Sequence, residues 1–85
     1  MTLGEIRQQV VVTYGGTVES AIAAAAWELG ISHPALRANL YGQRHSLAPE
    51  QIDRLARLIE LRFTDLLGLL TEREREVATI IQGGA

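Results

Sequence analysis

The sequence predicts an all-α protein: one compact five-helix domain that spans residues 1–85. Apolar residues recur at spacings of three and four along most of the chain, which is the period of an amphipathic helix. Capping residues, glycines and prolines divide this pattern into segments of helical length. Because 47% of the 85 residues are apolar, the chain can bury one small core and disorder is not expected.

The first helix is expected over residues 3–14. Thr2 and Glu5 have the spacing of a capping box, and apolar residues follow at helical intervals. The β-branched run at residues 10–13 would also suit a strand. No partner strand is found elsewhere, so a helix is favoured, and the glycines at 15–16 end it.

The second helix is expected over residues 18–29, with Thr17 as its N-cap. Its buried stripe consists of Val18, Ile22, Ala25 and Leu29. Trp27 lies off that stripe. We expect it to pack under the N- or C-terminal helix, because a large aromatic residue usually finds cover in its own domain, and a dimer contact is the alternative.

A tight turn should join the second helix to a third over residues 33–41. Gly30 can adopt the positive φ that ends a helix, and Ser32 is a good N-cap for the next one. Pro34 falls in the first turn, where its missing N–H costs nothing. Leu36 and Leu40 would then point inward.

Pro49 should open a long fourth helix that reaches Leu70, and Thr71 should cap a fifth. The apolar face of residues 49–70 is broader than one small core needs, so part of it is expected to meet a second copy of the chain. We therefore assign residues 49–82 to packing and dimerisation. The predicted dimer contacts are Leu58, Phe63, Leu66, Leu67, Leu70, Val77, Ile80 and Ile81.

Two helices joined by such a turn, over residues 18–41, have the pattern of a helix-turn-helix. The chain resembles that superfamily, and within it the Cro and lambda-repressor class, on residues that run from the second helix to the start of the fourth. These are Ala26, Gly30-Ile31-Ser32, Leu36, Leu40, Gly42-Gln43-Arg44 and residues 46–52. Asn39 departs from the class, which often has an apolar residue there, and gives the third helix some Fis-type character. The resemblance implies a small DNA-binding repressor of phage or mobile-element type.

If the third helix enters the major groove, its outward residues contact DNA. Arg37 is the best candidate for reading a base, because a guanidinium can bond guanine O6 and N7 together. Without that context, Arg37 would be an ordinary solvated side chain, and Asn39 an ordinary solvent-facing one. The predicted DNA contacts are Ser32, His33, Pro34, Arg37, Ala38, Tyr41, Gln43, Arg44 and His45.

The net charge of −2 argues against nucleic-acid binding, but its distribution favours it. No acidic residue lies between Glu28 and Glu50, whereas two arginines and two histidines do. Because a phosphate responds to the local field, this segment predicts a basic face.

The sequence offers no catalytic motif, no cofactor motif and no metal-ligand set, since cysteine is absent and the two histidines lack ligand partners. We expect a cytoplasmic protein, bacterial or phage-encoded, with no membrane span and no small-molecule ligand. The predicted function is a homodimeric repressor that occludes a promoter at a palindromic duplex DNA site. The alternative is a protein–protein interaction module that uses the apolar face of residues 49–70 without specific DNA binding.

Overall fold

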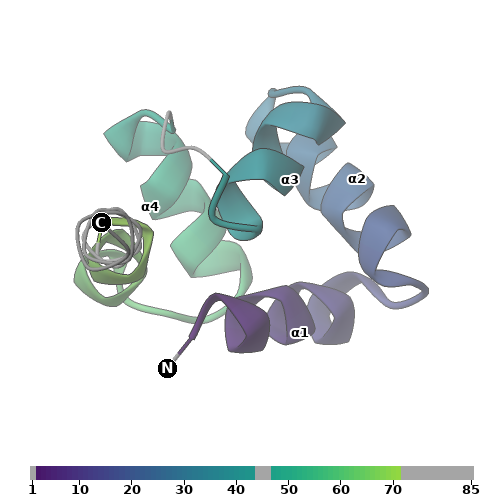
Figure 1. The fold of residues 1–85 in the computed structure, drawn as a ribbon, viewed down its shortest axis with the longest axis horizontal. Coiled ribbons are helices and arrows are strands. Elements are labelled where there is room, and N and C mark those ends of the chain that lie inside the picture. Colours follow the sequence, from purple (N-terminus) through teal and green to yellow (C-terminus); the bar gives the residue numbers. More distant parts are fainter. Residues whose placement is uncertain (1, 44–46, 72–85) are drawn as a thin grey trace, which may run out of the picture.

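Five helical segments follow one another in the computed structural model, which describes residues 2–43 and 47–71, and no strand occurs within these ranges. The segments are α1 (Leu3–Tyr14), α2 (Val18–Leu29), α3 (His33–Leu40), α4 (Pro49–Leu58) and a last helical segment at residues 63–71. Figure 1 shows α1 passing along one side of the other helices. α2 contacts each of the other three, α1, α3 and α4. The all-α prediction is confirmed for this part of the chain.

Polar side chains start the first three helices at the predicted positions. The backbone N–H of Glu5 donates to Thr2 Oγ1 at 3.2 Å. Thr17 and Ser20 cap each other reciprocally, and Ser32 Oγ accepts from the N–H of Ala35 at 3.2 Å. The β-branched run at 10–13 is helical, because Val10 packs fully into the core of α1 and its neighbours.

The turn between α2 and α3 depends on Gly30, whose backbone is left-handed at φ 69° and ψ 30°. Around it, the N–H of Ile31 donates to the carbonyl of Ala26 at 3.1 Å, and that of Gly30 donates to Trp27 at 3.2 Å. This pattern satisfies two of the last four carbonyls of α2 and redirects the chain over the three residues before α3.

The prediction of one long fourth helix is wrong. α4 ends at Leu58, and Glu60 adopts a left-handed φ of 58° although it is not glycine. The N–H of Leu61 donates to the carbonyl of Ala56 at 2.7 Å, so the chain ends α4 in the same way as Gly30 ends α2.

The predicted cap at Thr71 is also wrong. Thr71 lies inside the helical segment at 63–71, where its hydroxyl donates to the carbonyl oxygens of Leu67 and Gly68. The fifth helix predicted after it lies outside the described residues. The third helix ends at Leu40, one residue earlier than expected, with Tyr41 as its C-cap.

One apolar core joins all five segments. It includes the predicted inward pair, Leu36 and Leu40, and also Leu66 and Leu70. The last two were predicted to contact a second copy. Because both are fully covered within one chain, they are core residues instead. The other buried apolar residues are Ile6, Val10, Ala21, Ile22, Ala25, Ala26, Leu29, Leu47, Ile52, Leu55, Ala56 and Ile59.

Two further residues lie where the sequence did not predict them. Trp27 is 86% exposed, so the expected cover within its own domain is not found. Asn39 is fully buried, not solvent-facing, and its Nδ2 donates to the carbonyl of Ala35 at 2.8 Å. That bond within α3 compensates part of the cost of burying the amide.

Within residues 2–43 and 47–71, no one helix has both the length and the apolar character that crossing a membrane requires. α1 and α2 meet that test of length and composition only as a pair, and the pair is bent by 78°.

The two left-handed turns predict opposite effects of substitution. Replacing Glu60 by glycine should raise the free energy of unfolding by about 1 kcal/mol, because it removes the steric penalty of a Cβ at positive φ. Gly30→Ala should lower it by about the same amount for the converse reason. Chemical denaturation of both variants and the parent measures this, and a destabilised Glu60→Gly variant would contradict the turn at that position.

Candidate nucleic-acid interface

α3 is fixed from behind by packing and by one long-range hydrogen bond. Leu36 and Leu40 are fully buried on its inner side. At its end, Arg7 Nη1 from α1 donates to the carbonyl of Leu40 at 2.7 Å. This charge-assisted bond satisfies a carbonyl that the helix itself leaves without a partner. The opposite side of α3 therefore faces outward in a defined orientation.

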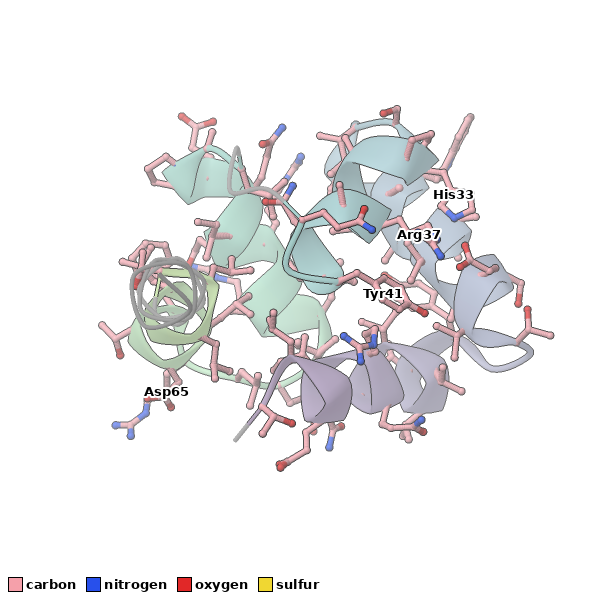
Figure 2. All side chains as sticks on the ribbon, viewed as in Figure 1. His33, Arg37, Tyr41 and Asp65 are labelled. Atoms are coloured by element: carbon pink, nitrogen blue, oxygen red, sulfur yellow. The ribbon has the colours of Figure 1, made fainter. Side chains whose placement is uncertain are left out.

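The described members of the predicted DNA-binding set lie on or next to this outward side. Ser32, Pro34, Tyr41 and Gln43 are exposed, and His33, Arg37 and Ala38 are half-buried. Figure 2 shows His33, Arg37 and Tyr41 following one another along the edge of this outward side that lies next to α2 and α1, far from Asp65. Arg44 and His45 lie outside the described residues.

An acidic residue from α2 enters this face. Glu19, in the first turn of α2, accepts a hydrogen bond from Arg37 Nε at 2.7 Å through Oε1. Its other oxygen, Oε2, lies 2.8 Å from His33 Nε2. The stretch between Glu28 and Glu50 is free of acids in sequence, but the face that it forms is not. The expectation of a purely basic face is therefore wrong at its centre.

Tyr41 links the same cluster to α1. The guanidinium carbons of Arg7 and Arg37 lie over its ring, at 4.3 and 4.5 Å from the ring centre. Such cation–π contacts contribute roughly 0.5–1 kcal/mol at exposed sites. We call Arg7, Glu19, His33, Arg37 and Tyr41 the outer cluster. It joins α1, α2 and α3 through contacts between side chains and through the bond from Arg7 to the backbone of Leu40.

Sequence reasoning missed two members of the outer cluster, Arg7 and Glu19. Arg7 has no acidic residue three or four positions away on its helix. This absence indicates that Arg7 can pair with a residue of another element. Glu19 lies in the first turn of α2, where a negative charge interacts favourably with the helix dipole. Because this local interaction already explains an acidic residue there, the sequence gives no reason to expect a contact with α3.

The pKa values of Glu19 and Arg37 follow from their short contact. The hydrogen bond from Arg37 holds the pKa of the Glu19 carboxyl below its ordinary value, and the contact with His33 adds to this effect. Conversely, Glu19 raises the pKa of Arg37. Both side chains remain more than two-fifths exposed, so the pair orients the guanidinium more than it stabilises the fold.

The arrangement offers hydrogen-bond donors and no metal site. Within the described part of the chain, Arg37 donates a hydrogen bond only through Nε. Both of its Nη groups can therefore donate to an external acceptor. Residues 2–43 and 47–71 contain no group of three histidine or acidic side chains that could hold a metal ion.

The predicted dimer contacts are divided by the structure. Leu58, Phe63 and Leu67 are half-buried and pack at the edge of the core, so each keeps part of its surface accessible. Val77, Ile80 and Ile81 lie outside the described residues.

Comparison of the chain with protein-family models, curated proteins and solved structures gives no match.

The Glu19–Arg37 contact predicts a specific titration. Following the Glu19 side-chain carboxyl carbon by NMR, we expect a midpoint below the ordinary glutamate range and a rise toward that range in Arg37→Ala. Because the folded pKa is lowered, the stabilisation is present above the unfolded pKa and is lost as the pH falls through the folded one. Arg57→Ala, which removes an exposed arginine paired with Asp53, is the control and should leave the midpoint unchanged. An ordinary midpoint in the parent would contradict the contact.

Proposed function

We propose that this protein binds double-stranded DNA through α3 and regulates transcription, with α2, the Gly30 turn and α3 acting as a helix-turn-helix. The observation that carries the proposal is the outward guanidinium of Arg37 on a short helix whose other side is anchored by Leu36 and Leu40. A helix held in this way can enter a major groove, which is about 12 Å wide.

The contacts divide into two kinds in this proposal. Arg37 reads a base edge, and Ala38 and Pro34 offer apolar contact to a thymine methyl group. Gln43 and Tyr41 contact the phosphate backbone in this proposal, which their exposure at and beyond the end of α3 supports. Phosphate contacts supply affinity and orientation, whereas the base contacts supply sequence preference.

We further propose that the protein acts as a homodimer and represses by occupying a promoter. Two copies would place their α3 helices about 34 Å apart, one turn of DNA, on a palindromic site. The accessible parts of Leu58, Phe63 and Leu67 form the candidate contact.

A protein–protein interaction module is the second candidate function, and the exposure of Trp27 favours it. Most of the apolar face at 49–70, on which that alternative first rested, belongs to the core. By contrast, an exposed tryptophan is typical of interface anchors.

Duplex binding should be steep in salt and should depend on Arg37. The logarithm of the affinity should fall by roughly 0.9 per phosphate contact for each tenfold increase in salt. After selection of bound sites from a random duplex pool, Arg37→Ala should weaken binding to the selected site by about 5- to 150-fold and relax one base position in each half-site.

Arg57→Ala is the matched control, because Arg57 is 79% exposed on α4 and pairs with Asp53 within its own helix. It should keep the parent's base preference. Salt-independent binding would contradict the phosphate contacts, and an unchanged preference in Arg37→Ala would remove Arg37 from base reading. Absence of duplex binding would favour the interaction module.

The dimer is tested separately by sedimentation at protein concentrations that saturate the selected site. We expect two chains per particle, and a monomer at those concentrations contradicts the proposal. Trp27 is the only tryptophan, so its fluorescence reports whether it joins the contact. If α4 and the 63–71 segment pair the chains, the emission should stay that of a solvated indole as the dimer forms.

A further inference from the structure

We propose that Glu19 is a positioning residue that fixes the guanidinium of Arg37 for reading a guanine. This inference rests on the proposed DNA binding and deepens it, since it names the base and a second residue on which its recognition depends. Glu19 touches no base itself. It acts through Arg37, whose Nε it holds.

The atoms used in the contact carry the argument. Glu19 Oε1 accepts from Arg37 Nε at 2.7 Å, and no other nitrogen of Arg37 is bonded within the described residues. A guanidinium held at Nε keeps its two Nη groups free as a parallel pair of donors. That pair is the edge that bonds guanine O6 and N7 together.

Two further contacts restrict the guanidinium. Tyr41 lies under it, with 4.5 Å between the Arg37 guanidinium carbon and the ring centre, so the ring opposes tilting of the guanidinium plane. His33 holds the second oxygen of Glu19 at 2.8 Å, so the carboxylate is itself oriented. Because these side chains are ordered before DNA arrives, less conformational entropy is lost on binding.

The exposed donor pair selects the base. Guanine presents two acceptors in the major groove, whereas adenine presents one acceptor and one donor, and cytosine presents a donor. Two N–H groups held in parallel therefore match guanine and meet an unfavourable donor at adenine or cytosine. An arginine side chain that rotates freely could bond other bases in other orientations, so it would discriminate less strongly between guanine and the other bases.

The opposite role for Glu19 is a general brake, in which its negative charge repels phosphates and reduces affinity for every sequence alike. The two roles differ in one measurable respect. A positioning residue changes the preference at one base pair, whereas a brake changes all affinities by the same factor.

The experiment selects bound duplexes from one random pool with the parent, Glu19→Ala and Glu19→Gln. In the parent we expect an enriched guanine at one position of each half-site. Glu19→Ala should reduce the preference for that guanine about fivefold or more, within the 5- to 150-fold range of a bidentate contact. Glu19→Gln should retain most of it, because a carboxamide oxygen still accepts from Nε.

Glu28→Ala is the matched control, since it removes the same charge from an exposed position on the same helix. It should change affinity without changing the preference. Replacing the selected guanine by 7-deazaguanine, which lacks the N7 acceptor, should weaken the parent more than Glu19→Ala. Circular dichroism checks that each variant is folded.

Two results overturn the inference, and they are distinguishable. If Glu19→Ala binds every sequence more tightly by one factor and keeps the parent's preference, Glu19 is a brake, and the proposed DNA binding stands. If the parent binds no duplex from the pool, the proposed function and this inference both fail.

Discussion

The left-handed turn at Gly30 is the constraint on which the candidate interface depends. Only three residues separate the end of α2 from the start of α3, so the direction of α3 is set by backbone geometry and not by a flexible loop. Burial of Leu36 and Leu40 then fixes the rotation of α3 about its axis. Because the direction and the rotation of α3 are both fixed, Arg37 points outward and forms its ion pair with Glu19 at the start of α2.

Signals that act over one helical turn predicted the first half of the fold. α1 and α2 have the expected ends, because Thr2, Thr17 and Gly30 act on the backbone within a few residues of themselves. The end of α4 was missed for the same reason. Glu60 carries no local signal for a left-handed turn, and the apolar spacing continues across it. After the break, Leu66 and Leu70 of the segment at 63–71 pack into the core, and such packing is not visible in a local pattern.

The candidate interface shows the same division between local and long-range information. Periodicity predicts that Arg37 faces outward, but it does not predict Glu19, which is 18 residues away, or Arg7, which reaches the end of α3 across 33 residues. The distribution of charge along the sequence therefore gave a wrong prediction for the face around α3, which was expected to be basic. The segment around α3 lacks acids, yet the nearest charge to Arg37 in space is a carboxylate from the preceding helix.

The outer cluster also explains how α1 contributes to a surface that it does not itself form. Arg7 bonds the last carbonyl of α3 and lies over the Tyr41 ring, and Arg37 lies over that same ring. A shift of α1 would therefore move Tyr41 and, with it, the plane against which Arg37 is held. The Arg37 side chain is thus positioned by residues of three helices, and the pairing of Nε with Glu19 leaves its Nη edge without a bonded partner among the described residues.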